Sequence, residues 1–394
     1  MLVGGGSGGH ITPLLAVAKN LKINIPESNI LYVGHLGDKL SDIADDAGVF
    51  DKTYAVRAGK LRRYHKEGWK QLLDLPELFK NLRDGFYFLG GIWQSYWLLR
   101  KLKPDVIFIK GGFVGAPIGL AASMLKIPFI THDSDAIPGL ANRMIQRWAK
   151  AHAVAMSLDV YSYPLTKTHQ TGIPVRKEYQ FVTQELQQHY KSELSFESAN
   201  PIICINGGGL GAQKINQAFI EILSKLAKIS PEIGVLHICG RNNYDEVLGS
   251  YQTLAKKYNL KYYRVEGFVS DAYKYSGAAD VVICRAGATS LAEYALQGKA
   301  CIIVPNPRLT GGHQIKNAQV LANQGAAYVV EEDSLDQDGA QTLLDAITEL
   351  TQSKALRLAY GQTLHDTAIV DAAERITQLI TSMLPSQKGR GRGA

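Results

Sequence analysis

The sequence contains few cysteines and no apolar run long enough to cross a membrane. None of its four cysteines belongs to a CxxC pair, and each lies in or beside an apolar segment. Buried, reduced thiols are therefore expected, as in a cytosolic protein, rather than a disulfide framework. The uncharged stretch at residues 111–125, for example, is too short and too rich in Gly and Pro to span a bilayer. No secretory leader is expected, because residues 4–9 are largely glycine where its apolar segment would stand.

An acidic residue is missing from the place where a nicotinamide-dependent enzyme needs one. Two loops match the Gly-x-Gly-x-x-Gly/Ala pattern, at Gly4–Gly9 and at Gly207–Ala212, and such loops let a backbone approach a phosphate. A dehydrogenase also needs an acid at the end of the next strand to hold the ribose. Here those strands end in Gly34-His35 and in Cys239-Gly240-Arg241. The sequence therefore argues against a dehydrogenase. The loops also carry no DxD-like motif, so we expect neither a metal ion nor a cofactor.

Short apolar strands alternate with amphipathic helices along most of the 394 residues. This length exceeds one ordinary core and favours two domains. Alternation of this kind is typical of parallel sheets with crossover helices. The pattern restarts at Pro201, and each half opens with a strand, a glycine-rich loop and a helix. We therefore predict an α/β fold of two Rossmann-like, doubly wound domains.

The predicted chain has five parts. They are an N-terminal domain over 1–172, a connection over 173–200, a C-terminal domain over 201–365, a helix over 366–385 and a basic tail over 386–394. The helix is expected to return to the N-terminal domain. The tail is polar and rich in glycine, and we expect it to be disordered.

Two further loops combine small residues with polar side chains. Residues 284–293 follow an apolar strand and open a helix, where backbone amides can hold a diphosphate. Glu293 is placed to bond ribose hydroxyls, or alternatively it only complements the helix dipole from the surface. His313 and Gln314 begin a later helix, where they bond sugar hydroxyls or simply form a polar helix start.

Taken together and in order, these motifs resemble one family. The motifs are GGGSGGHITPLLAVA, GGFVGAPIGLAA, HDSDAIPGLANR, TGIPVR, GGGLGAQKIN and RAGATSLAE with HQIKNA. They resemble the MurG family, the lipid-linked peptidoglycan N-acetylglucosaminyltransferases. The resemblance implies a GT-B fold whose two domains face each other across a cleft.

The resemblance also implies the two substrates. The donor would be UDP-N-acetylglucosamine, held by the C-terminal domain. The acceptor would be undecaprenyl-diphospho-N-acetylmuramoyl-pentapeptide, held by the N-terminal domain, whose C4 hydroxyl displaces UDP with inversion. The matching donor positions are Arg176, Gly208, Gly209, Asn216, Phe268, Val269, Ala288, Thr289, Ser290, Glu293, His313 and Gln314. The matching acceptor positions are Ser7, Gly8, Gly9, His10, Phe113, His132 and Asn142.

His10 is the first candidate for the general base, because imidazole titrates near neutral pH. Alternatively it only orders the loop at the helix start. Asp133 and Asp135 are rival bases. They belong to a departure from the family, which commonly reads HEQN where this chain reads His132-Asp133-Ser134-Asp135.

Three further positions depart from the family pattern. Tyr is common where this chain has Phe113, Ser-Gln where it has Gly209-Leu210, and Asn where it has Ile173. Three of the four departures lie in or beside the acceptor half. A related transferase that uses another lipid-linked or glycolipid acceptor therefore stays an alternative.

Residues 57–103 combine positive charge with aromatic side chains. They contain eleven Lys/Arg against four Asp/Glu, and three of the four tryptophans. Such a mixture suits the headgroup region of an anionic membrane. We expect peripheral attachment at the cytoplasmic face of the cell membrane. The alternative is a pair of amphipathic core helices. Nucleic-acid binding is not expected, because no supporting module accompanies the charge.

Two other functions remain open from the sequence. A nucleotide-sugar 2-epimerase shares the GT-B fold and would release UDP without any acceptor. A membrane scaffold for other wall enzymes would need no donor site, and the nearly complete donor motifs argue against it.

Overall fold

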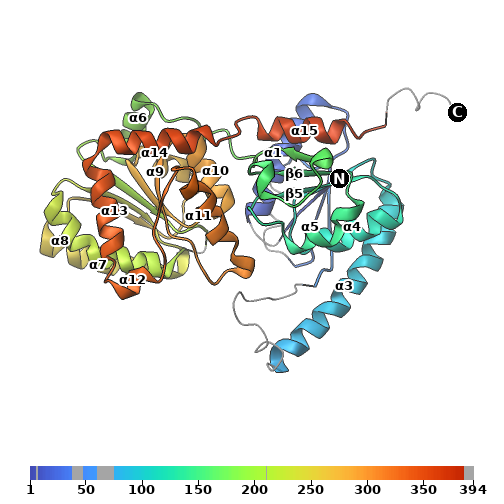
Figure 1. Ribbon diagram of the computed structural model, residues 1–394, viewed down its shortest axis with the longest axis horizontal. Helices are drawn as coiled ribbons and strands as arrows, with labels where there is room; N and C mark the ends of the chain where they lie inside the picture. Colours follow the sequence, from blue (N-terminus) through green and yellow to red (C-terminus); the bar gives the residue numbers. More distant parts are fainter. Residues whose placement is uncertain (6–7, 38–47, 60–74, 210, 386–394) are drawn as a thin grey trace. The chain divides into compact units, whose positions relative to one another are not determined.

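The protein folds into two units, each built on one parallel sheet (Figure 1). The computed structural model describes residues 1–5, 8–37, 48–59, 75–209 and 211–385, with the backbone alone at 8–10, 75–82 and 310. The first unit comprises Met1–Arg176 and Ile369–Ala394, and the second comprises Lys177–Ala368. The second unit is therefore inserted, in sequence, into the first.

The first unit has a seven-stranded parallel sheet in the order β3-β2-β1-β4-β5-β6-β7. The chain starts in β1, builds outward through β2 and β3, and then crosses to β4 on the other side of β1. This reversal is the switch point of a doubly wound sheet. The strands are β1 (Leu2–Val3), β2 (Leu31–His35), β3 (Lys52–Val56), β4 (Ile107–Ile109), β5 (Phe129–Asp133), β6 (Ala151–Val154) and β7 (Thr168–Gln170). The helices are α1 (Gly8–Asn24), α3 (Leu75–Leu102), α4 (Gly115–Met124), α5 (Leu140–Ile145) and α15 (Ala372–Thr381).

The strands of this sheet are buried on both faces, as expected for a parallel sheet. Alternate residues point to opposite faces. Leu2 and Phe108 join one core, which includes Val17 of α1 and Ile376 of α15. Their neighbours in sequence join a second core, formed with α3, α4 and α5. Helix α15 therefore belongs to the first unit, although it lies near the end of the chain.

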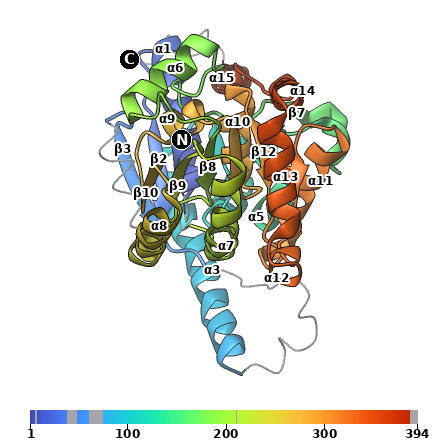
Figure 2. The same ribbon diagram turned by 90° about the vertical axis from the view of Figure 1, so that its left-hand side faces the viewer.

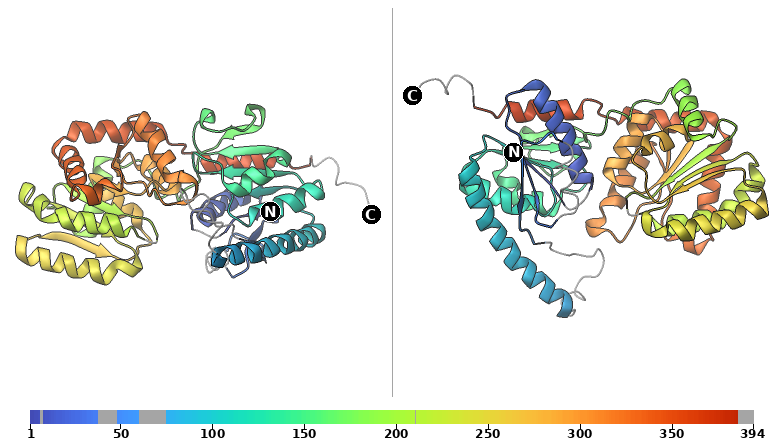
Figure 3. Two further views of the ribbon diagram at one scale, coloured as in Figure 1. Left: turned by 60° about the horizontal axis from the view of Figure 1, so that its bottom comes forward. Right: turned by 180° about the vertical axis from the view of Figure 1, so that it is seen from behind.

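Residues 75–102 form a single continuous helix, α3, at the outside of the first unit (Figure 3). One side is buried at Asp84, Gly91, Ser95 and Leu99. Another side exposes Phe86, Leu89, Trp93 and Trp97, each by at least half of its surface. We call these four residues the apolar stripe. Among the helices in the described ranges, none is long and apolar enough to cross a membrane.

The second unit has a six-stranded parallel sheet in the order β10-β9-β8-β11-β12-β13. Figure 2 shows β10, β9 and β8 next to one another, in agreement with this order. The strands are β8 (Ile202–Asn206), β9 (Gly234–Ile238), β10 (Tyr262–Glu266), β11 (Val281–Cys284), β12 (Ala300–Ile303) and β13 (Tyr328–Val329). The helices are α6 (Gln184–Leu194), α7 (Gln213–Ile229), α8 (Tyr244–Tyr258), α9 (Ala272–Ala278), α10 (Ala288–Gln297), α11 (His313–Asn323), α12 (Ser334–Gln337), α13 (Gln341–Gln352) and α14 (Lys354–Asp366).

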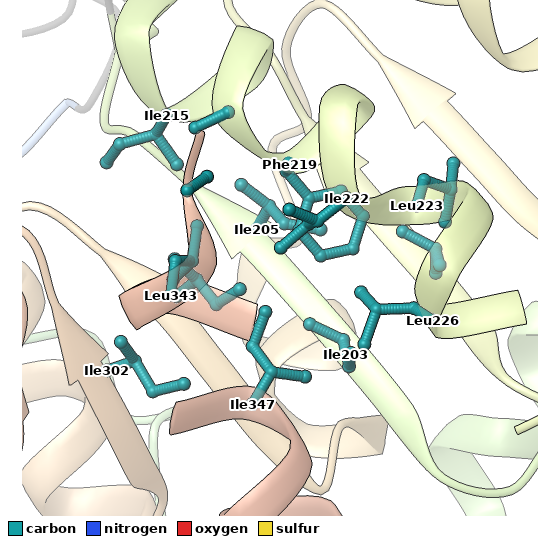
Figure 4. Close-up of a cluster of buried hydrophobic side chains, with 14 of the residues drawn as sticks. Ile203, Ile205, Ile215, Phe219, Ile222, Leu223, Leu226, Ile302, Leu343 and Ile347 are labelled. Atoms are coloured by element: carbon teal, nitrogen blue, oxygen red, sulfur yellow. The ribbon is translucent and has the colours of Figure 1, made fainter. Parts of the chain in front are cut away.

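The core of the second unit is again split by its sheet. Ile203 and Ile205 of β8 meet Phe219 of α7 and Leu343 of α13 on one face (Figure 4). The alternate residues of β8, Ile202 and Cys204, face the other side, where α6, α9 and α10 cover the sheet. The predicted fold class, α/β with two Rossmann-like parallel sheets, is confirmed.

Candidate functional site

The second unit gathers its glycine-rich loops at one edge of the sheet. The loop after β8 and the loop after β11 follow neighbouring strands, on the two sides of the switch point. In open parallel sheets, ligands bind outside the carboxyl ends of the strands at this point. The sheet order therefore brings together two segments that lie far apart in the sequence, residues 207–212 and 285–288.

Glycine is required by the backbone in the first of these loops. Gly208 and Gly211 have φ of +90° and +77°, where other residues are strained. A Cβ atom on Gly211 would lie 2.1 Å from the carbonyl oxygen of Cys239. A Cβ atom on Gly208 or Gly209 would meet nothing within 4 Å. At Gly211 the loop therefore packs directly against the end of β9, whereas Gly208 and Gly209 face open space.

Asn216 supports this loop from inside the unit. Its side chain is buried, and its Nδ2 donates to the Cys239 carbonyl over 3.0 Å. Its Oδ1 lies 3.0 Å from His237 Nε2, and His237 Nδ1 lies 3.0 Å from the Tyr251 hydroxyl. Burial lowers the pKa of His237 to about 3, so the ring is neutral at pH 7. Both polar atoms of Asn216 thus take part in a buried series of hydrogen bonds that runs from Tyr251 to the Cys239 carbonyl, next to Gly211.

A cavity of about 440 Å³ opens beside this loop, within the second unit. Its walls include the backbone of Gly207, Gly209 and Gly211, the start of α7, and Gln314 from the start of α11. Gln314 accepts a hydrogen bond from the backbone of Asn306 over 2.9 Å, which fixes the bend before α11. We call this space the donor-loop cavity. Its backbone amides and helix start suit an anionic group.

Three cations line the donor-loop cavity: Lys214, Arg285 and Arg308. Arg285 is paired with the buried carboxylate of Glu332 and also donates to the Val304 carbonyl over 3.0 Å. Lys214 is paired with Asp336. Arg308 is exposed at the cavity wall. The pattern is that of a site for a negatively charged ligand.

The other predicted donor residues lie at the same edge of the sheet. Phe268 follows β10, is half exposed, and has the Arg241 guanidinium 4.4 Å from its ring centre. Val269, next to it, packs against the core. The first turn of α10 contains Ala288, Thr289 and Ser290, and the half-buried Glu293 follows in the next turn. His313 begins α11, which is tied to the β11 loop by a hydrogen bond from Asn317 to the Ala286 carbonyl.

The first unit repeats this arrangement at its own switch point. The loop after β1 is anchored at Gly4, whose carbonyl accepts the Tyr32 hydroxyl over 2.7 Å. Gly8, Gly9 and His10 form the first turn of α1. Ser7 lies outside the described residues, as does the side chain of His10.

The end of β5 forms a buried polar cluster. Asp133 accepts hydrogen bonds from Gly139 N, Asn142 Nδ2 and the Tyr163 hydroxyl, at 2.9, 2.9 and 2.8 Å. Asn142 also donates to the His132 carbonyl, and His132 Nε2 lies 2.9 Å from the Gly172 carbonyl. Burial raises the pKa of Asp133, against the lowering effect of these three bonds. These contacts indicate that Asp133 holds the turn after β5.

Lys110 lies directly after β4 and is buried beside this cluster. Its ammonium donates to the hydroxyl of Ser134. Burial lowers the pKa of Lys110 to about 8, although the charges of Asp135 and Asp133 oppose the shift. Asp135 is half buried, and its carbonyl accepts the Tyr161 hydroxyl over 3.0 Å. The HDSD departure is thus accompanied by a buried cation.

Two predicted residues remain, Phe113 and Arg176. Phe113 follows β4 and stacks edge-on against His35, with the ring centres 4.8 Å apart. Arg176 is the last residue of the first unit's leading segment, although the sequence assigned it to the donor. The described ranges contain no group of three or more His, Cys, Asp or Glu side chains placed to hold a metal ion.

Sequence reasoning did not assign several residues that line these spaces. In the second unit they are Lys214, Arg285, Asn306, Arg308 and Glu332. A cation directly after an apolar strand was the available signal for Arg285, and the same signal marks Lys110. Nothing in the sequence indicates Glu332, which reaches the cavity through the fold alone.

Comparisons with known proteins cover nearly the whole chain. The model of the glycosyltransferase family 28 N-terminal domain matches residues 1–154, and that of the C-terminal domain matches residues 202–376. A relative from Thermoanaerobacter sp. (strain X514) is 33% identical over 386 residues, which is 97% of this chain and 99% of the relative. It is named UDP-N-acetylglucosamine--N-acetylmuramyl-(pentapeptide) pyrophosphoryl-undecaprenol N-acetylglucosamine transferase.

Two further matches agree with this one. A relative of the same name from Natranaerobius thermophilus is 30% identical over 385 residues, covering 98% of this chain and 99% of the relative. The crystal structure of Acinetobacter baumannii MurG matches with a TM-score of 0.73 and 25% identity, over 97% of this chain and 98% of that one. With the paired sheets and glycine-rich loops described above, these likenesses show that the chain belongs to the MurG family of glycosyltransferases, within glycosyltransferase family 28.

Proposed function

We propose that the protein transfers N-acetylglucosamine from UDP-N-acetylglucosamine to undecaprenyl-diphospho-N-acetylmuramoyl-pentapeptide, with inversion, in peptidoglycan synthesis. The observation that carries the proposal is the likeness to transferases of that name over almost the full length of both chains. The anion-suited loops at the switch point of the second sheet support a nucleotide-sugar donor there.

The donor residues have different roles in this proposal. The half-exposed ring of Phe268, with Val269, borders the uracil, and Glu293 bonds the ribose. The backbone of Ala288–Ser290, which opens α10, and of Gly207–Gly209, in the loop before α7, receives the diphosphate. His313 and Gln314 contact the sugar. Asn216 acts on the loop through Cys239, since its own polar atoms are already used.

The acceptor hydroxyl must lose a proton as it attacks. Among the three candidates, His10 and Asp135 fit the role of base better than Asp133, because Asp133 is buried and accepts three hydrogen bonds. Gly8, Gly9, Phe113, His132 and Asn142 belong to the acceptor side. In this proposal His132 and Asn142 shape the β5 turn from within.

Attachment to a membrane surface is part of the proposal. The apolar stripe leaves two tryptophans on one side of α3, and the Arg100 guanidinium lies 5.6 Å from the Trp97 ring. Aromatic rings beside cations suit the headgroup region of an anionic bilayer. A lipid-linked acceptor would be met at the cytoplasmic face by peripheral contact.

The decisive experiment is mass spectrometry of the products formed from UDP-N-acetylglucosamine and defined lipid acceptors. The expected product carries one added N-acetylhexosamine on the muramoyl-pentapeptide acceptor, in β-1,4 linkage. A set of other glycolipid acceptors serves as the control. Faster transfer to one of these would replace the acceptor assignment, and a changed sugar with UDP released in the absence of acceptor would indicate an epimerase.

A further inference from the structure

A second cavity, also of about 440 Å³, lies within the first unit. It sits at the carboxyl ends of β2 and β3, against α3. Its lining residues include two arginines, Arg57 and Arg83, together with His35, Tyr87, Phe113 and Asp84. We call it the arginine cavity. Only Phe113 among these residues was expected at a substrate site.

The backbone that frames the arginine cavity is closely packed. A Cβ atom on Gly91 of α3 would lie 2.2 Å from the Arg57 carbonyl oxygen, and one on Gly59 would lie 1.8 Å from the Asp84 carbonyl oxygen. The Arg57 amide also donates to Gln94 Oε1 over 2.9 Å. The segment after β3 therefore packs closely against α3 at Arg57 and again at Gly59.

The charges of the cavity are suited to phosphate oxygens. Asp84 is buried, and its Oδ1 accepts from Arg83 Nη2 over 3.4 Å. This contact orients the Arg83 guanidinium, which has five N–H donors in a planar fork. Arg57, a second arginine, also lines the cavity. Two such forks beside one carboxylate leave a net positive site that matches the bidentate geometry of phosphates.

The remaining walls suit a ligand with an apolar part. His35 and Phe113 stack edge-on, and the Arg83 guanidinium lies 5.6 Å from the Tyr87 ring. Arg83 and Tyr87 stand on the same helix that carries the apolar stripe. One element thus supplies both a cation for the cavity and the exposed apolar side chains of Phe86 and Leu89. This combination fits an amphiphile with a phosphorylated head and a lipid tail.

We propose that the arginine cavity binds the diphosphate of the lipid-linked acceptor, with Arg57 and Arg83 donating hydrogen bonds to its oxygens. The inference rests on the proposed function and deepens it, because it assigns the acceptor diphosphate to a site beyond the loop after β1. A polyprenyl diphosphate and an anionic bilayer lipid both present phosphate oxygens that arginine can bind. The experiment distinguishes between these two ligands.

The test compares Arg57→Gln, Arg83→Gln and the double variant with wild type. Lys101→Gln is the matched control, because it removes one exposed charge from the last turn of α3 outside the cavity. Transfer is measured with a short-chain acceptor that is soluble without vesicles. The double variant is expected to raise the KM for this acceptor about tenfold or more, the scale of lost charged hydrogen bonds. Its KM for UDP-N-acetylglucosamine stays within about twofold of wild type, as does that of the control.

Two further measurements use inorganic pyrophosphate as a competitor and anionic vesicles as a binding surface. Pyrophosphate should compete with the acceptor in wild type and lose about tenfold in potency in the double variant. Flotation on phosphatidylglycerol vesicles should fall no more in the double variant than in the control. An unchanged acceptor KM, with or without a larger loss of flotation, would overturn the proposal and leave a headgroup contact at most.

Failure of the proposed function gives a different result. If wild type transfers no sugar to any lipid diphosphate, calorimetry with inorganic pyrophosphate tests the cavity directly on the full chain. Saturable binding that is lost in the double variant and retained in Lys101→Gln supports the site. Equal binding by all three proteins, or none by wild type, would overturn it.

Discussion

Gly211 offers the sharpest test of the donor loop. Replacing it by Ala places a methyl group at a φ of +77°, which costs about 1–2 kcal/mol for an L-residue. The same methyl would lie 2.1 Å from the Cys239 carbonyl oxygen and 2.8 Å from Asn243 Nδ2. A backbone carbonyl cannot rotate away, so overpacking adds about 1–3 kcal/mol. We expect Gly211→Ala to destabilise the second unit by about 2–5 kcal/mol.

The same loop supplies two matched controls. Gly208→Ala meets open space at a φ of +90°, so it should cost only about 1–2 kcal/mol. Gly209→Ala also meets open space and lies outside the left-handed region, so its effect should stay within about 0.5 kcal/mol. The ranking Gly211, Gly208, Gly209 is the prediction.

The measurement must separate the two units. Amide hydrogen exchange in β4 and β5 reports the first unit and should be the same in all three variants. Amide hydrogen exchange in β8 and α7 reports the second unit. If Gly211→Ala proved no more destabilising than Gly209→Ala, the contact between this loop and Cys239 would be refuted.

Four other predictions concern the sites and the surface. Glu293→Ala should weaken UDP binding by about 1–3 kcal/mol in calorimetry, the scale of lost charged hydrogen bonds, and an unchanged affinity would refute a contact between Glu293 and the ribose. His10→Ala should lower turnover about 10²–10⁴-fold with UDP affinity unchanged. If His10→Gln retained most activity, His10 would only orient the loop. Replacing Trp93 and Trp97 by Ser should reduce salt-sensitive flotation on anionic vesicles, with circular dichroism as the control for folding. The folded-state pKa of Lys110 is lowered from 10.5 to about 8, so between these pH values the unfolded chain binds more protons. The stability of wild type relative to Lys110→Met should therefore rise from pH 8 to pH 10.5, by on the order of 3 kcal/mol in urea titrations. A flat difference would indicate a solvated ammonium.

The strands and their loops could be predicted because local sequence determines them. Apolar strands such as Ile202–Asn206 are followed by glycine, and the helix that comes next has its own periodicity. Parallel sheets then place the carboxyl ends together without further information. The donor loops could therefore be assigned to one edge from the sequence alone.

Buried polar partners could not be predicted, because they come from distant parts of the chain. Asp133 is a plausible base in the sequence, yet Tyr163, thirty residues away, donates to its carboxylate. Asn216 resembles a ligand-binding amide, yet His237 and Cys239 use both of its polar atoms. Neither contact leaves a local pattern.

The single helix α3 shows how tertiary contact outweighs propensity. Gly90 and Gly91 lie inside it, and two adjacent glycines disfavour a continuous helix. Gly91 is needed because its position meets the Arg57 carbonyl at a distance that admits no side chain. The close approach, rather than the local sequence, explains a glycine in mid-helix.

The split first unit has a consequence for synthesis of the protein. Residues of α15, such as Ile376 and Ile380, complete a core whose other members lie near the N-terminus, at Leu2 and Val17. A ribosome makes the entire inserted unit, Lys177–Ala368, before it makes these residues. The second unit can therefore close its core while the first still exposes one face of its sheet. Emerging chains would need protection at that face until α15, Ala372–Thr381, leaves the exit tunnel, and truncations that remove α15 would harm the half of the protein that begins the chain.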